Sequence, residues 1–141
     1  MEMKQYQSIF STLCICVVIT GALLCVHLGS AVLAAPASGM QVQEVSIDAA
    51  FFMWQKKEVT IIDVRTPDEF NEGHVPGAIL IPVTELENRL DEVPANDVKV
   101  LLICRSGKRS ANANILLQKH GFSNTYSVVG GISAWPGKLE K

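Results

Sequence analysis

The sequence predicts one α/β domain, in which a central, mainly parallel sheet is flanked by helices in three layers, preceded by an apolar N-terminal helix. Past residue 37 about 105 residues remain, the size of one ordinary domain. In that part, short runs rich in β-branched residues alternate with segments of helical pattern, which favours a parallel sheet. The run 98–104, VKVLLIC, is almost wholly apolar, as expected of a strand that is buried on both faces.

Five apolar runs are predicted as strands, because turn signals bound each of them. In chain order these strands are 42–45, 59–64, 78–81, 98–104 and 125–129. Residues 98–104 are expected at the centre of the sheet. Their cysteine then lies at the carboxyl end of a central strand, where open α/β sheets bind ligands.

Helices are predicted between the strands. Ser46 is a candidate N-cap for a helix over 48–56, and Thr66 and Pro67 have the order of an N-cap and first residue for a short helix that reaches Asn71.

A third helix is predicted in the segment 83–93, where Thr84 and Glu87 have the spacing of a capping box. The apolar residues that mark one face of this helix are Val83, Leu86, Leu90 and Val93. A fourth helix is predicted over 110–120 and is closed by Gly121.

Residues 1–37 are predicted to form a signal peptide or a membrane anchor. Ile9 to Ala35 is almost wholly apolar and long enough to cross a bilayer. Small residues precede two candidate cleavage points, after Ala34 and after Ala37. The apolar run is longer, and the positive charge before it weaker, than in an ordinary signal peptide, so both alternatives stay open.

Charge in the leader predicts its orientation. No Lys or Arg lies between Lys4 and Lys56, so the positive-inside bias keeps the N-terminus in the cytoplasm and sends the domain across the membrane. The domain is therefore expected in the periplasm, either soluble or anchored through its N-terminal segment.

Composition argues against several kinds of partner and site. Lys and Arg number 12 and Asp and Glu 14, a net charge of −2, so nothing indicates nucleic acid. Only His74 and His120 accompany a single cysteine in the domain, which is not the inventory of a metal site, and no cofactor is expected. Of four cysteines, three lie in the leader, so Cys104 is either a buried structural thiol or a reactive one.

The loop CRSGKRS, residues 104–110, predicts that Cys104 is reactive. Neighbouring cations and a helix N-terminus lower the pKa of a thiol, and Arg105, Lys108 and Arg109 all follow within five residues. Gly107 allows a positive φ, which turns the amides of the loop inward as an anion-binding nest. Together these features outweigh the alternative of a small apolar residue at a strand end.

The length of the loop bears on what it binds. A cysteine loop that transfers phosphate has five residues between Cys and Arg, because its amides and arginine surround a whole phosphate. Here four residues separate Cys104 from Arg109, and Ile103 stands where such phosphatases carry His. The shorter loop suits a single sulfur atom attached to the cysteine.

The chain from about residue 42 to 137 resembles a single-domain rhodanese (thiosulfate sulfurtransferase). The matching motifs are IIDVRTPDEFNEGHVPGAILIP, ICRSGKRS and VVGGISAWPG, in that order over nearly the whole domain. The resemblance implies a rhodanese-like α/β fold and two-step covalent catalysis. In this chemistry Cys104 takes the sulfane sulfur of thiosulfate as a persulfide, and a thiophilic acceptor such as cyanide or a thiol removes it.

The resemblance implies that the loop binds the substrate. The expected substrate-binding residues are Arg105, Ser106, Gly107, Lys108, Arg109 and Ser110. The three cations among them are assigned to the thiosulfate dianion and to the departing sulfite. Ser110 equally fits the N-cap of the helix that follows.

Other polar residues near the motifs are expected to have structural or supporting roles. Asp63 and Arg65 are predicted to form an ion pair at a strand end rather than to act as catalytic groups. His74 is predicted to hold a turn, and His120 to lie on the surface at a helix C-terminus. A last group fits either the wall of a pocket or ordinary turn and core positions, namely Gly130, Gly131 and Trp135.

Two alternatives to a sulfurtransferase remain. A phosphatase or arsenate reductase on the same fold is disfavoured by the spacing between Cys104 and Arg109. A non-catalytic module would bind a protein partner, or pass a persulfide from one protein to another, through the same loop.

Overall fold

The computed structural model describes residues 40–141, so the apolar helix and the signal or anchor predicted for residues 1–37 lie outside the described residues. In the part that the structure describes, no helix has the length and apolar character needed to cross a membrane.

The described residues contain one sheet whose strands are all parallel to their neighbours. Its strands are β1 (Glu44–Val45), β2 (Val59–Asp63), β3 (Ile79–Leu80), β4 (Lys99–Ile103) and β5 (Thr125–Val128). Their order across the sheet is β1-β5-β4-β2-β3, so β4 is central. The predicted parallel sheet is confirmed, with the apolar run 98–104 at its centre as expected.

Three α-helices connect the strands: α1 (Ile47–Gln55), α2 (Pro67–Glu72) and α3 (Lys108–Lys119). Their starts follow from local capping chemistry. The Ser46 hydroxyl accepts from the Ala49 amide at 3.3 Å, and the Thr66 hydroxyl accepts from the Glu69 amide at 3.4 Å. Both predicted N-caps are confirmed, because each satisfies an amide that has no partner within the helix.

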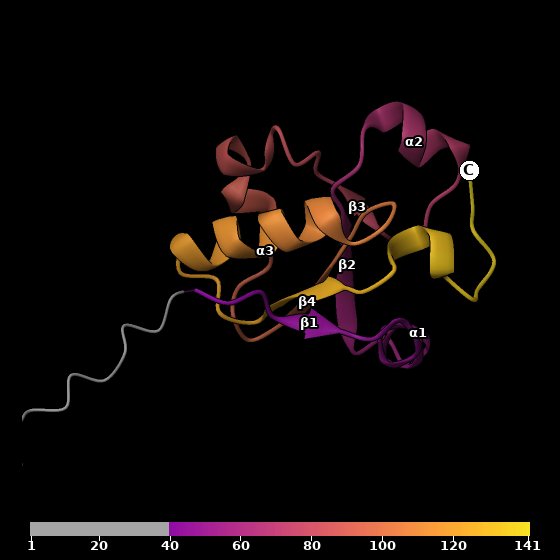
Figure 1. Ribbon diagram of the computed structural model, residues 1–141, viewed down its shortest axis with the longest axis horizontal. Coiled ribbons are helices and arrows are strands. Elements are labelled where there is room, and N and C mark those ends of the chain that lie inside the picture. The colour runs from indigo at the N-terminus through magenta and orange to yellow at the C-terminus, as the bar shows by residue number, and fades with distance from the viewer. Residues whose placement is uncertain (1–39) are drawn as a thin grey trace, which may run out of the picture. The chain divides into compact units, whose positions relative to one another are not determined.

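Helices cover both faces of the sheet, with α3 on one face and α1 on the other (Figure 1). Alternation along β4 divides its side chains between two apolar clusters. Leu102 and Cys104 pack with Leu117 of α3, whereas Leu101 and Ile103 pack on the side of α1. Each fully buried leucine or isoleucine stabilises the fold by about 1.5–3 kcal/mol, so β4 is firmly held up to the residue where it reaches the cysteine.

The prediction of an α-helix in the segment 83–93 is wrong. This segment forms two short 3₁₀ turns, Leu86–Asn88 and Leu90–Glu92, and neither has a side-chain cap, so the capping box of Thr84 and Glu87 does not form. Arg89 breaks the helical path between the turns with φ −128° and ψ 31°. Its guanidinium donates hydrogen bonds to the carboxylates of Glu85 and Glu92 and to the Leu80 carbonyl, which stabilises this interrupted backbone.

The apolar face predicted for this segment is nevertheless buried. Leu86 and Val93 lie in the cluster beneath α3, and Val83 and Leu90 pack against it. Apolar spacing therefore identified the side chains that enter the core, but not the backbone conformation that carries them.

Candidate active site

The Cys104 loop connects the central strand to α3. β4 ends at Ile103 and α3 begins at Lys108, two residues before the predicted start. Gly107 is the N-cap, with φ +101°, a conformation that side-chain-bearing residues rarely adopt. Ser110 is therefore not the cap that the sequence allowed, but lies inside the first turn, fully buried.

Gly131 fixes the position of this loop from the side of β5. It begins the 3₁₀ turn η3 (Gly131–Ala134), whose Ile132 amide donates to the Cys104 carbonyl at 2.8 Å. A Cβ at residue 131 would lie 2.2 Å from that carbonyl oxygen, and φ there is +58°. Only glycine fits so close to the loop, which agrees with the turn position that the sequence allowed for this residue.

The thiol of Cys104 lies under the amides of its own loop. The residue is 1% exposed, and its Sγ accepts from the Gly107 amide at 3.2 Å. Burial raises the pKa of the thiol, but hydrogen bonds from Ser110, Ser106 and Gly107 more than offset this, so the pKa lies below its ordinary value. The loop therefore stabilises a thiolate, the nucleophilic form of cysteine.

The three cations contribute less to the thiolate than the sequence suggested, because hydrogen bonds to the sulfur are the main cause of its lowered pKa. The side chains of Arg105 and Lys108 are exposed, and within residues 40–141 neither forms an ion pair. Both remain available to an anionic ligand at the mouth of the loop.

Arg109 has a partner that the sequence analysis did not identify. Its guanidinium binds both carboxylate oxygens of Glu69, at 2.6 and 2.7 Å, across 40 residues of sequence. The hydrogen bond from Arg109 is the main cause that lowers the pKa of Glu69 to about 2. These two bonds tie the loop to α2, and the predicted binding of the substrate dianion by Arg109 stays a prediction.

The ion pair expected between Asp63 and Arg65 is present at the end of β2. The closest atoms, Arg65 Nη2 and Asp63 Oδ2, are 2.6 Å apart, and both side chains are buried. The same guanidinium donates to the carbonyls of Glu69 and Gly73, so it joins β2 to both ends of α2. The hydrogen bonds of Arg65 to Asp63, Glu69 and Gly73 therefore hold the end of β2 together.

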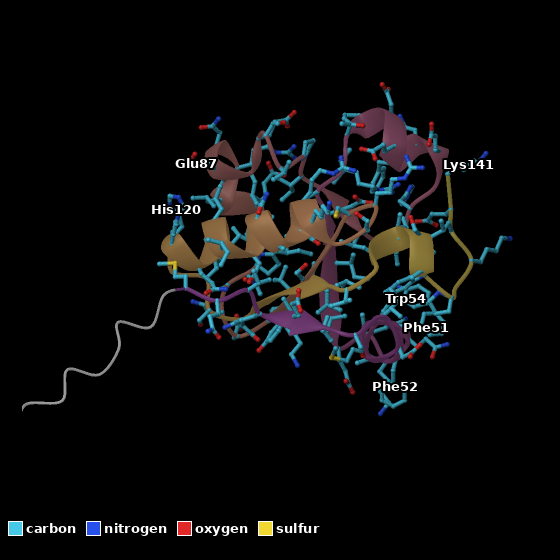
Figure 2. The ribbon with its side chains drawn as sticks, in the orientation of Figure 1. Phe51, Phe52, Trp54, Glu87, His120 and Lys141 are labelled. Atoms are coloured by element: carbon cyan, nitrogen blue, oxygen red, sulfur yellow. The ribbon has the colours of Figure 1, made fainter. Side chains whose placement is uncertain are left out.

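The two histidines of the domain lie in structural positions. His74 stacks on Phe70, and its Nδ1 lies 3.0 Å from the Phe70 carbonyl. His120 lies on the surface, 3.5 Å from Glu87, at the end of α3 that is remote from Cys104 (Figure 2). Neither is placed as a general base for the thiol.

A cavity of about 240 Å³ lies beside the loop, between α2 and η3. It is lined by Arg65, Glu69, Glu72, Gly73, Arg105, Ile132, Ser133 and Leu139. Arg105 joins the cavity to the cysteine loop, so a ligand seated there lies next to the loop. The described residues contain no cluster of His, Cys, Asp or Glu that could hold a metal ion.

The fold and the loop define a class of protein: a parallel α/β domain that presents one nucleophilic cysteine in a cradle of amides. The chain belongs to the family of the rhodanese-like domain, whose model matches residues 52–138.

Relatives and solved structures agree with this family. The chain is 37% identical over 100 residues to the "Putative sulfur carrier protein YrkF" of Bacillus subtilis, covering 70% of this chain and 54% of that protein. It is 37% identical over 79 residues to a protein of Allochromatium vinosum named "Sulfurtransferase", covering 56% and 73%. It also resembles a rhodanese-like domain protein from Staphylococcus aureus, with TM-score 0.62, 28% identity, and coverage of 70% and 97%. The chain thus spans only about half the length of the first of these relatives.

Proposed function

We propose that this protein is a sulfurtransferase that carries sulfur as a persulfide on Cys104, with thiosulfate as donor and a thiol as acceptor. The observation that carries the proposal is the Gly107 amide at 3.2 Å from Sγ, in a loop whose hydrogen bonds lower the pKa of the thiol. The same amides suit the charged outer sulfur of a persulfide, since its charge needs donors when water is excluded.

The proposed reaction has two displacements. The Cys104 thiolate attacks the outer sulfur of thiosulfate, the sulfur–sulfur bond of thiosulfate breaks, and sulfite leaves with the electron pair. An acceptor thiolate, or cyanide in an assay, then attacks the outer sulfur of the persulfide, and Cys104 leaves as a thiolate. Arg105 and Lys108, exposed beside the loop, are assigned to attracting thiosulfate and the departing sulfite.

The bond between Arg109 and Glu69 disfavours the phosphatase alternative. A phosphate-transferring loop needs its arginine free to bind phosphate oxygens, whereas this guanidinium already binds a carboxylate through two nitrogens. Releasing it would leave Glu69 without its partner.

Persulfide relay between proteins is the second candidate, and the relative named as a sulfur carrier favours it. The same persulfide serves both candidates. They differ in whether the acceptor is a small thiol or a cysteine of another protein.

Intact mass tests the proposal. Full-length protein incubated with thiosulfate is expected to gain one sulfur atom, which cyanide removes. Cys104→Ser is the matched control, because it retains the three leader cysteines, and it is expected to gain none. Equal gain in the variant would place the sulfur elsewhere and refute the assignment to Cys104.

We also propose that the domain is exported, on the strength of the apolar run from Ile9 to Ala35 and the charge asymmetry around it. Fusing alkaline phosphatase after Lys141 tests this, because that enzyme is active only outside the cytoplasm. An inactive but intact fusion would contradict export, and the mass of the recovered chain shows whether the leader is cleaved.

A further inference from the structure

A pair of buried hydroxyl groups lies behind the cysteine, between α3 and β5. The Ser110 and Ser127 oxygens are 2.8 Å apart, and the two residues are 0% and 1% exposed. Buried polar groups lower stability unless they are hydrogen-bonded, so a buried serine pair beside the cysteine needs an explanation. Helix capping does not supply one, because Gly107 is the N-cap of α3.

The hydrogen bonds of the pair lead to the sulfur. Ser110 Oγ lies 3.6 Å from Cys104 Sγ and 2.9 Å from the Gly107 carbonyl oxygen. Among the described residues, the Ser127 hydroxyl has no hydrogen bond to the sulfur. It contacts the Ser110 hydroxyl and, at 3.4 Å, the Gly107 carbonyl oxygen. The shortest path from Ser127 to the sulfur therefore runs through Ser110, with a longer contact to the carbonyl of Gly107.

Counting protons shows what the pair does when the thiol ionises. A hydroxyl has one proton to donate and two lone pairs to accept with. While Cys104 is a thiol, the sulfur can donate to Ser110 Oγ, and Ser110 donates to the Gly107 carbonyl. A thiolate can only accept, so the Ser110 proton turns toward it. The Gly107 carbonyl still accepts from the Ala111 amide at 3.0 Å and is not left unpaired.

In the thiolate state Ser110 Oγ can accept a bond, and Ser127 lies at 2.8 Å to donate it. Hydrogen bonds in a chain polarise one another, so a donor behind Ser110 strengthens the bond that Ser110 makes to the sulfur. We propose that Ser127 is a positioning residue, whose hydroxyl donates to Ser110 and so directs the Ser110 proton at the Cys104 sulfur when it is an anion. The inference rests on the proposed function in taking that anion as the working form of the cysteine.

The charged groups around the thiol come from other elements. They are Arg105, Lys108 and Arg109 of the loop and α3, Glu69 of α2, and Asp63 and Arg65 at the end of β2. Tyr126 is the only titratable residue of β5 and packs in the cluster on the side of α1. A substitution at Ser127 leaves all of these charged groups in place. Any change in the titration of Cys104 is therefore due to the loss of the Ser127 hydroxyl.

The same interface offers a matched control. Thr125 of β5 is also buried, and its hydroxyl accepts from Asn114 of α3 at 2.9 Å. This bond has the same setting as the serine pair but no contact with the cysteine loop. Thr125→Val therefore removes one buried hydroxyl from the interface without touching the chain of hydrogen bonds to the sulfur.

The experiment measures the alkylation rate of Cys104 against pH in full-length protein, followed by the mass of the peptide that contains Cys104. Ser127→Ala is expected to shift the profile to higher pH and to slow alkylation on its acid side by about 3- to 10-fold, the effect of one ordinary hydrogen bond. Thr125→Val is expected to leave the profile where wild type has it. An unchanged profile in Ser127→Ala, or an equal shift in both variants, would overturn the inference.

Ser127→Thr and Ser127→Val provide a second comparison, because their side chains have nearly the same shape and only threonine keeps the hydroxyl. The threonine variant is expected to follow the wild-type profile and the valine variant that of alanine. Identical profiles in this pair would also refute the role, even if Ser127→Ala did not fold. Since alkylation needs no sulfur donor, this result is independent of whether thiosulfate loads the protein.

Discussion

The ends of two neighbouring strands, β2 and β4, each place an arginine against a carboxylate, but the two pairs differ in range and burial. Arg65 and Asp63 are two residues apart in sequence and have side chains 6% and 0% exposed. Arg109 and Glu69 are 40 residues apart and have side chains 34% and 24% exposed. The first pair closes the end of β2, and the second ties the cysteine loop to α2.

This difference agrees with placing the proposed chemistry at the end of β4. At β2 the Arg65 guanidinium donates to two backbone carbonyls as well as to Asp63, so this end is held mainly by bonds within the fold although Arg65 also lines the cavity. At β4 the sulfur is held by amides and Ser110, while Arg105 and Lys108 remain exposed. Stability and reactivity are thus separated between two adjacent strand ends, and substitutions can test the separation.

The largest effect is expected from Cys104→Ser. A serine hydroxyl does not ionise near neutral pH and cannot form the persulfide, so transfer of sulfur from thiosulfate to cyanide should fall to the level of a blank without protein. The melting temperature should change little, because a hydroxyl can occupy the same cradle. Turnover that survived in the variant would show that the end of β4 is not the reactive one.

Asp63→Asn should produce the opposite result. Removing one partner of a buried ion pair typically costs about 3–5 kcal/mol, and the neutral amide leaves the Arg65 charge uncompensated in the interior. We expect a loss of about 3 kcal/mol, measured by urea unfolding, with sulfur loading per folded molecule close to that of wild type. Asp91→Asn, an exposed change of the same kind, serves as the control and should have almost no effect. A collapse of loading in a fully folded Asp63→Asn protein would give this pair a catalytic role.

Features set by neighbouring residues were predictable from the sequence, whereas long-range pairings were not. The β-branched runs and the Ser46 and Thr66 caps are local, and they correctly predicted the strands and the first two helices. The turn at Gly107 also follows from adjacent residues, as does the prediction that Cys104 is reactive, with which the lowered pKa of its thiol agrees. The Arg109–Glu69 pair joins parts of the chain that meet only in the fold, so no neighbouring residue indicates that this guanidinium has a carboxylate partner.

Some of the missed features left a trace in the sequence. Thr66 and Glu69 have capping-box spacing, which places the glutamate in the first turn of α2, but not against the loop. Ser127 is a polar residue in a strand of the sheet, a hint that a buried partner exists. The prediction of a helix in the segment 83–93 was wrong for a different reason. One apolar face is compatible with an α-helix and with two 3₁₀ turns, and the conformation of Arg89 separates the two turns.

A moderate effect is expected from Lys108→Met, compared with Lys119→Met at the other end of α3. Both lysines are exposed, but only Lys108 lies at the cysteine loop. Losing one cation there should raise the thiosulfate KM by about 2- to 5-fold and weaken its dependence on salt, since exposed charges attract anions through a screened field. Steady-state kinetics at low and high salt measure this. Equal effects of the two substitutions would mean that net charge, rather than a local cation, attracts the donor.

The smallest effect is expected from Glu69→Gln, whose loss of stability relative to wild type is present near neutral pH and shrinks in acid. The pKa of Glu69 is lowered from 4.5 to about 2 in the folded protein, mainly by its bond to Arg109. A carboxylate with a lowered pKa stabilises the fold above its unfolded pKa, and this contribution is lost as the pH falls from about 4.5 through about 2. Because both side chains are partly exposed, solvent screens the pair and the contribution is about 1 kcal/mol.

Urea unfolding at pH 6 and pH 3 measures this contribution. Between these values wild type should lose about 0.5 kcal/mol more than Glu69→Gln, whose amide does not titrate, because pH 3 lies above the folded pKa and part of the contribution remains. Glu58→Gln, on the exposed turn before β2, should lose as much as wild type. If Glu69→Gln showed the same acid loss as wild type, the pair with Arg109 would not persist in solution. Arg109 would then be free to bind the substrate. The Asp63–Arg65 pair at the end of β2 would be the only one of the two ion pairs that is stable in solution.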